Sequence, residues 1–162
     1  MAVGDDRPGL TRSLADAIVE AGGNWLESHF ARLGGKFVGS VLVELPEERV
    51  GQLEEAAATM DASGFHVSLM PSVETQRPDG RPLGFVLVGA DRPGIVREVA
   101  AALASLDVNI EELESGTAPG AMSGEKLFRT RARVQVPDGT SLERVREVLE
   151  RISGEIMVDF ED

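Results

Sequence analysis

The sequence predicts an α+β protein of two modules, each a four-stranded antiparallel sheet with two helices on one face. Two observations support this fold class. The segment 4–12 (GDDRPGLTR) returns as the segment 89–97 (GADRPGIVR), with six of nine positions identical and an offset of 85 residues. In each half, the apolar patterns follow the order β-α-β-β-α-β. A repeat of this length indicates two small domains rather than a solenoid.

The repeat extends beyond this segment. Residues 24–25 (Asn-Trp) align with residues 109–110 (Asn-Ile) at the same offset. Later in each half, Phe37 aligns with Phe128 at an offset of 91. The second half therefore carries six additional residues in one loop.

The first half is expected to hold six elements. Its patterns predict a strand at 2–3, a helix over 8–21, strands over 24–33 and 36–45, a helix over 47–60 and a strand over 65–70. The first strand is short, because only Met1 to Val3 precede the repeated segment. Either this strand is stunted, or the true start of the protein lies upstream. A short strand would give the first loop weaker support.

The second half repeats this order. Its patterns predict a strand over 83–88, a helix over 93–106, a strand over 109–115, a loop over 115–125, a strand over 127–136, a helix over 143–152 and a strand over 155–160. The strand over 127–136 alternates apolar and polar residues, which is typical of an antiparallel strand with one buried face. The positive charges of Arg129, Arg131 and Arg133 lie on its exposed face. They indicate a solvated sheet face, pairing with carboxylates, or a docking surface for an acidic partner. Ser141 is placed to cap the helix that follows.

Proline and glycine are concentrated between the two halves, over 71–82. This composition is typical of a linker. We therefore expect a first module at 1–72, a linker at 73–82 and a second module at 83–162.

The composition excludes several classes of function. The net charge is −12, from 16 basic and 28 acidic residues, so neither direct nucleic-acid binding nor adhesion to an anionic membrane is expected. The chain has no cysteine, which excludes disulfides, thiol catalysis and cysteine-based zinc sites. It has neither an apolar run long enough to span a membrane nor the profile of a signal peptide. A soluble cytoplasmic protein is expected.

The repeated Asp-Arg-Pro-Gly lies where a strand turns into a helix. A helix N-terminus offers unpaired N–H groups and a partial positive charge. Asp6 and Asp91 are expected to cap these groups, and Pro8 and Pro93 suit a first helical turn. All of these features are also explained by folding alone.

The same loop suits a small zwitterion such as an amino acid. Gly9 and Gly94 remove a side chain where a ligand or another backbone could approach closely. Arg7 and Arg92 can act as bidentate partners of a carboxylate. The residues alone leave both readings open, a binding site and a structural turn.

Residues 89–96 (GADRPGIV), followed by a helix and by Val-Asn-Ile at 108–110, resemble the signature of ACT domains. These are ferredoxin-like βαββαβ modules that bind amino acids and regulate proteins. Two such modules with little else resemble the glycine cleavage system transcriptional repressor family.

The resemblance implies a non-catalytic sensor of a small amino acid, glycine or similar, without a cofactor. It also implies a homo-oligomer or a partner protein, because effectors of ACT modules lie between the first loop of one module and the second strand of its neighbour. The implied ligand-binding residues are Asp91, Arg92, Pro93, Gly94, Asn109 and Ile110, with Asp6, Arg7, Pro8, Gly9, Asn24 and Trp25 in the first copy.

The first copy departs from the pattern at Trp25, where an aliphatic residue is expected. This side chain is interpreted as a packed aromatic, although it could also wall off the first site or fill a contact between modules. If only one copy binds ligand, we expect it to be residues 91–94, which follow a full strand.

Three other functions share features with this sequence. An acylphosphatase-like enzyme has this strand order and a loop arginine, but the Gly-rich phosphate loop is missing, and no nucleophile has the partners it requires. An RNA-binding module stacks bases on sheet aromatics, which the strand over 127–136 lacks. A dimerisation module without a functional ligand site remains the main alternative. His29 and His66 do not occupy matching positions and are not expected to share a metal.

Overall fold

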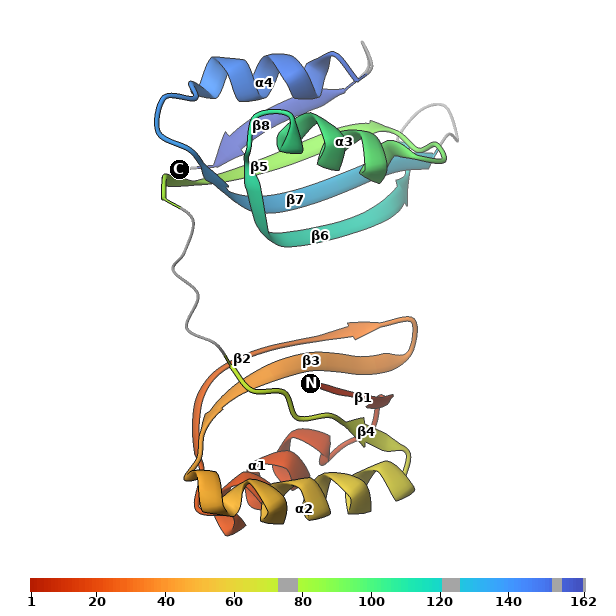
Figure 1. Cartoon of the computed structure of the whole chain (residues 1–162). Helices are drawn as coiled ribbons and strands as arrows, with labels where there is room; N and C mark the ends of the chain where they lie inside the picture. Colours follow the sequence, from red (N-terminus) through yellow and green to blue (C-terminus); the bar gives the residue numbers. More distant parts are fainter. Residues whose placement is uncertain (73–78, 121–125, 153–155, 162) are drawn as a thin grey trace. The chain divides into compact units, whose positions relative to one another are not determined.

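The computed structural model of the chain describes residues 1–72, 79–120, 126–152 and 156–161. The chain forms two compact units, Met1–Glu74 and Thr75–Asp162. Each unit holds one four-stranded antiparallel sheet, and two helices cover one face of that sheet (Figure 1). The predicted fold class is therefore confirmed.

The first unit has the sheet order β2-β3-β1-β4. Its elements are β1 (Ala2–Asp5), α1 (Leu10–Glu20), β2 (Asn24–Leu33), β3 (Lys36–Glu44), a 3-10 turn (Glu47–Arg49), α2 (Val50–Ala62) and β4 (Phe65–Val67). β1 has four residues, against ten in its counterpart β5 (Arg81–Ala90). The short first strand that the sequence indicated is thus present, although it continues to Asp5.

The core of the first unit lies between the sheet and its two helices. Leu10, Leu14 and Ile18 repeat at helical spacing along α1 and are all buried. Four aromatic rings continue this core across the sheet. The ring centroids of Trp25 and Phe30 are 6.0 Å apart. Those of Phe30 and Phe37, which are stacked, are 4.8 Å apart, and those of Phe37 and Phe65 are 6.4 Å apart.

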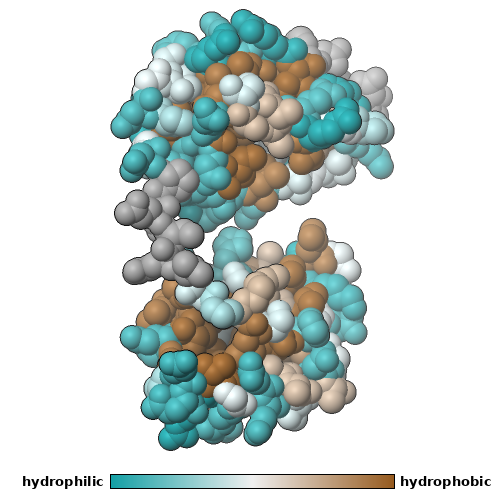
Figure 2. Space-filling model, viewed as in Figure 1, coloured by the Kyte–Doolittle hydropathy of each residue, from teal (hydrophilic) through white to brown (hydrophobic). Residues whose placement is uncertain are grey.

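The opposite face of this sheet is left uncovered by the unit's own helices. Val3 and Leu42 lie on this face and are 39% and 40% exposed. Val38, which is paired with Val3 across the strands, lies there too. Figure 2 shows apolar residues at the surface of both units among hydrophilic ones.

The second unit has the sheet order β6-β7-β5-β8. Besides β5, its elements are α3 (Ile95–Ala104), β6 (Asn109–Pro119), β7 (Lys126–Val136), α4 (Leu142–Glu150) and β8 (Met157–Glu161). β5 begins two residues before the predicted start at Leu83. Of the segment expected to be a linker, residues 73–78 lie outside the described residues.

The expectation of a loop over 115–125 is wrong for its first part. β6 continues to Pro119, which pairs with Lys126 at the start of β7. Cross-strand pairing with β7 outweighs the weak strand propensity of the local glycine and proline. Residues 121–125 lie outside the described residues.

The alternation predicted for β7 is confirmed. Its apolar positions and Thr130 face the core, and Thr130 donates a hydrogen bond from Oγ1 to the Glu114 carbonyl oxygen at 2.8 Å. On the other face, Arg131 pairs with Glu161 at 3.0 Å, and Arg133 pairs with Glu112. These two arginines are therefore held by carboxylates of their own sheet.

Candidate functional site

The repeated loop connects the first strand to the first helix in each unit. Gly9 has φ 96° and ψ −8°, and Gly94 has φ 91° and ψ −4°. A proline followed by a glycine with these angles is typical of a type II turn, which requires a positive φ at its third residue. In the second copy, Ile95 N–H donates to the Arg92 carbonyl oxygen at 3.4 Å and closes the turn.

The backbone conformation of the turn explains why glycine stands at positions 9 and 94. A Cβ at Gly9 would meet no protein atom within 4 Å, and at Gly94 the nearest atom would be 3.9 Å away. Within their own unit, these glycines therefore do not avoid a crowded backbone, and close approach by a ligand or by another chain remains an expectation. They supply a backbone angle that other residues rarely adopt.

The expected capping by aspartate is also wrong. The N-caps are Gly9 and Gly94, and neither helix start has a side-chain cap hydrogen bond. Pro8 and Pro93 precede the caps and so lie outside the first helical turn. The cause is the type II turn, which places Pro-Gly between the aspartate and the helix. Asp6 instead pairs with Arg32 at 2.8 Å.

The loop arginines both reach the end of the second helix of their own unit. Arg7 donates from Nη2 to the Ser63 carbonyl oxygen at 3.1 Å, and Arg92 donates from Nη2 to the Ile152 carbonyl oxygen at 3.4 Å. Carbonyl groups at a helix C-terminus carry partial negative charge, so a guanidinium there is stabilising. This role was missed from the sequence, where no local signal connects residues so far apart along the chain.

Arg92 has a second partner, for which Arg7 has no equivalent among the residues that the structure describes. It forms a bidentate pair with Glu98, with Nη1–Oε1 at 2.9 Å and Nη2–Oε2 at 2.5 Å. The hydrogen bond from Arg92 holds the pKa of the Glu98 carboxyl below its usual value, and the bond to Glu98 raises the pKa of Arg92. At the matching position of the first unit stands Ser13, whose hydroxyl donates to the Gly9 carbonyl oxygen at 3.1 Å.

The two parts of the site expected from the resemblance lie apart within each unit. Asp5, the last residue of β1, pairs with Lys36, whereas Asn24 pairs with Glu44 at the far end of β3. Lys36 and Glu44 are eight residues apart along β3, which corresponds to roughly 26 Å of strand. In the second unit, Ala90 pairs with Leu127 and Asn109 with Gln135, which repeats the separation. One unit alone therefore does not bring its loop and the start of its second strand together, although the far end of β2 does reach the loop through Arg32.

Trp25 and Ile110 are the second residues of the corresponding strands β2 and β6. Both are half-buried and pack against the core of their own unit. Each is followed by an irregularity in strand pairing, between Trp25 and Glu27 and between Ile110 and Glu112. Trp25 is therefore a packed aromatic in the first unit.

A cavity of about 590 Å³ lies beside the first loop. It is lined by residues 6–12 and by Phe37. Phe37 is half-buried there, whereas its counterpart Phe128 is only 5% exposed. Two arginines, Arg7 and Arg12, and one aromatic ring are thus among its lining residues, and Arg12 also pairs with Asp16 at 3.5 Å.

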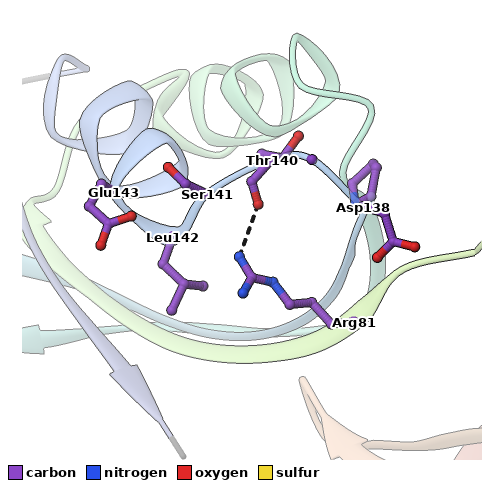
Figure 3. Close-up of a pocket in the computed structure, with 8 residues that line it drawn as sticks. Arg81, Asp138, Thr140, Ser141, Leu142 and Glu143 are labelled. Atoms are coloured by element: carbon purple, nitrogen blue, oxygen red, sulfur yellow. Dashed lines mark hydrogen bonds between the residues drawn. The ribbon is translucent and has the colours of Figure 1, made fainter.

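A second cavity, of about 440 Å³, lies in the second unit (Figure 3). It is lined by Arg81 and by residues 137–143, around the start of α4. The Arg81 guanidinium points to Thr140 and donates to its carbonyl oxygen at 2.9 Å. None of the residues expected to bind ligand lines this cavity.

The described residues contain no group of three or more His, Asp or Glu side chains able to hold a metal ion. His66 pairs through Nδ1 with Asp61 at 2.7 Å. His29, in β2, lies opposite Ser40 of β3. Within the same described ranges, no helix is both long and apolar enough to cross a membrane.

Models of the ACT domain match the chain over residues 1–64 and 85–154. Among solved structures, an unknown protein from Galdieria sulphuraria is 32% identical, with a TM-score of 0.79, and the match covers 99% of this chain and 94% of that one. A candidate glycine cleavage system transcriptional repressor is 17% identical, with a TM-score of 0.73 and the same coverage of both chains. At this identity the second likeness concerns the fold alone. No curated protein sequence matches the chain.

Proposed function

The chain belongs to the ACT domain family, and from this premise we propose that it is a non-catalytic regulatory protein that binds a small amino acid. Binding changes its association with a partner, either a second copy of this chain or another protein. The proposed ligand-binding residues are those of the two loops and the two strand starts, Asp6, Arg7, Pro8, Gly9, Asn24, Trp25, Asp91, Arg92, Pro93, Gly94, Asn109 and Ile110.

The cavity beside the first loop carries this proposal furthest. Its lining includes Arg7 and Arg12 near the start of α1, a helix whose first turn contains no acidic residue. Guanidinium groups and the N-terminus of a helix both favour a carboxylate. An amino acid supplies that group in a molecule small enough for a cavity of about 590 Å³.

The regulatory part of the proposal is supported by a surface. Val3, Val38 and Leu42 give the uncovered face of the first sheet an apolar centre. Apolar area removed from water stabilises an association by about 25 cal/mol per Å². This face is a candidate for the contact that responds to ligand.

The finer proposal names glycine as the amino acid and transcriptional control of glycine cleavage as the process. It is supported by the tandem layout and by the candidate repressor of the same fold. The alternative is a module that only mediates association and has no functional ligand site. In its favour, Arg7 and Arg92 are both bonded to carbonyl groups of their own units.

Thermal unfolding against each of the twenty amino acids tests the proposal. A ligand present at a hundred times its dissociation constant adds about 2.7 kcal/mol to the stability of the folded state. We expect a rise in melting temperature with one or a few amino acids, glycine first among them, and none with glycinamide, which lacks the carboxylate. If no amino acid shifts the melt, the association-only alternative replaces the sensor.

A further inference from the structure

We propose that the two loops are not equivalent: Glu98 fills the second loop as an internal carboxylate, so that the carboxylate of a ligand binds at the first loop, on Arg7. This inference rests on the proposed function and concerns which copy carries it out. It makes Glu98 the residue that closes one of two sites related by duplication.

In the second unit, the position of a ligand carboxylate is already taken. Both oxygens of Glu98 accept hydrogen bonds from Arg92, at 2.9 and 2.5 Å. A side chain on the adjacent helix turn is present at a far higher effective concentration than a free ligand, since no translational freedom is lost when it binds. A free amino acid would have to displace Glu98 to bind Arg92 in the same way.

In the first unit, the same position holds no carboxylate. Ser13 replaces Glu98 in the repeat, and its hydroxyl is directed to the Gly9 carbonyl oxygen. The only hydrogen bond of the Arg7 side chain within the described residues goes to the Ser63 carbonyl oxygen, at 3.1 Å. A guanidinium has five N–H donors, so Arg7 can still bind both oxygens of a carboxylate.

The two acidic residues beside Arg7 are paired with other cations. Asp5 pairs with Lys36, and Asp6 pairs with Arg32 at 2.8 Å. Both therefore form ion pairs with cations other than Arg7, although the pKa of the Asp5 carboxyl, which is lowered mainly by the hydrogen bond from Lys36, is also lowered by the charge of Arg7. In the second unit, Ala90 stands at the position of Asp5, and Leu127 stands at the position of Lys36.

The surroundings of the two loops also favour the first loop as the ligand site. The cavity of about 590 Å³ beside the first loop reaches the half-buried ring of Phe37. In the second unit, the matching Phe128 is buried at 5% exposure. The first loop thus offers a cationic end and an apolar wall, which suits the carboxylate and the apolar Cα of a small α-amino acid. This reverses the expectation from strand lengths, which favoured residues 91–94.

The chain has a built-in reporter for the first unit. Trp25 is its sole tryptophan. It is connected to the cavity by Phe30, at 6.0 Å, and by Phe37, which stacks on Phe30 at 4.8 Å. Tryptophan emission therefore follows binding at the first loop, while titration calorimetry counts all sites in the chain.

The test uses the full chain, each of the twenty amino acids and glycinamide as the ligand without a carboxylate. The variants are Arg7→Ala, Glu98→Gln and the double variant Arg92→Ala/Glu98→Gln. Arg49→Ala, at the opposite end of α2 from Ser63, controls for loss of an arginine. Glu147→Gln, on α4, controls for loss of a glutamate. Circular dichroism confirms that each variant is folded, and Arg7→Lys replaces Arg7→Ala if the latter is not.

We expect the wild type and both controls to bind one amino acid per chain with a change in Trp25 emission. Arg7→Ala loses this binding at least tenfold, Glu98→Gln gains a second site without further change in Trp25 emission, and the double variant loses that second site. Two sites in the wild type, full binding by Arg7→Ala, or a single site in Glu98→Gln would each overturn the inference and leave the sensor function standing. If no amino acid binds any variant, including Glu98→Gln, the proposed function itself fails.

Discussion

Arg92 and Glu98 form a bidentate ion pair that fastens the second repeated loop to the first helix of its unit, with N–O distances of 2.9 and 2.5 Å. The pair is partly exposed, with about a third of each side chain in contact with solvent. It nevertheless has two parallel hydrogen bonds, the geometry in which an arginine and a carboxylate interact most strongly. The first unit has no equivalent of it, because Ser13 stands at the position of Glu98 there.

This pair predicts a dependence of stability on pH. The hydrogen bond from Arg92 lowers the pKa of the Glu98 carboxyl below the ordinary 4.5. A group whose pKa is lowered by folding stabilises the folded state at pH above its unfolded value, and this contribution disappears as the pH falls through the folded value. Glu98→Gln should therefore melt below the wild type at neutral pH, and the difference should close at pH below 4.5. A difference that stays constant through this acid range would contradict the assignment.

The type II turn predicts the effect of a methyl group at Gly94. Gly94 has φ 91°, and a Cβ there would have no atom closer than 3.9 Å. Gly94→Ala should therefore destabilise the protein by about 1–2 kcal/mol through backbone strain alone. Urea unfolding measures this loss.

Gly51→Ala is the matched control for this substitution. Gly51 lies in α2 without a positive φ, and a Cβ there would also meet nothing within 4 Å. Gly51 is the second residue of α2, where alanine can adopt the same backbone angles, so the substitution should stabilise by about 0.4–1 kcal/mol because it reduces the conformational freedom of the unfolded chain. If both variants change stability in the same direction, the turn does not depend on the left-handed conformation of Gly94.

Much of the fold could be predicted because its patterns are local. The period of two along β7 and the period near 3.6 along α1 depend only on which face of an element is buried. Ser141 was identified as an N-cap, and its hydroxyl does accept the N–H of Arg144 at 3.1 Å. The duplication then transferred each assignment from one half to the other.

The candidate site was less predictable because its contacts are tertiary. Asp6 was expected to cap a helix, but the type II turn moved the helix start to Leu10 and left Asp6 to pair with Arg32. The partner of Arg7 is a carbonyl group 56 residues away. Glu98, the partner of Arg92, is close to it in sequence. The sequence therefore contained one signal of a difference between the two loops, which is Ser13 at the position that corresponds to Glu98.

The Ser141 cap predicts a measurable loss on substitution. Ser141→Ala removes the acceptor of the Arg144 N–H at the start of α4. Loss of a serine N-cap costs about 1 kcal/mol. Ser105→Ala is the control, because the Ser105 hydroxyl donates to the Ala102 carbonyl oxygen at the end of α3 and caps no N–H group. Chemical denaturation should show the larger loss for Ser141→Ala, and equal losses would show that the cap contributes nothing.

Strands β2 and β3 approach each other closely at Gly39, which predicts that a larger residue there destabilises the first unit. A Cβ at Gly39 would lie 2.2 Å from the His29 carbonyl oxygen and 2.5 Å from Cδ1 of Phe30. The first of these is a backbone atom that cannot turn aside, so the strand itself must shift. Gly39→Ala should therefore destabilise the first unit by about 1–3 kcal/mol, as overpacking does elsewhere. Trp25, which packs near Phe30 on the same strand, reports this unfolding by fluorescence.

Gly116→Ala provides the comparison for this prediction. Gly116 lies in β6 of the second unit, where a Cβ would meet nothing within 4 Å. Its substitution should change stability by no more than about 0.5 kcal/mol, as is usual at the surface. The contrast isolates the crowding at Gly39 from the general effect of removing a glycine from a strand. If Gly39→Ala unfolds at the same denaturant concentration as the wild type, the His29 carbonyl group and the ring of Phe30 do not lie as close to Gly39 as the structure describes.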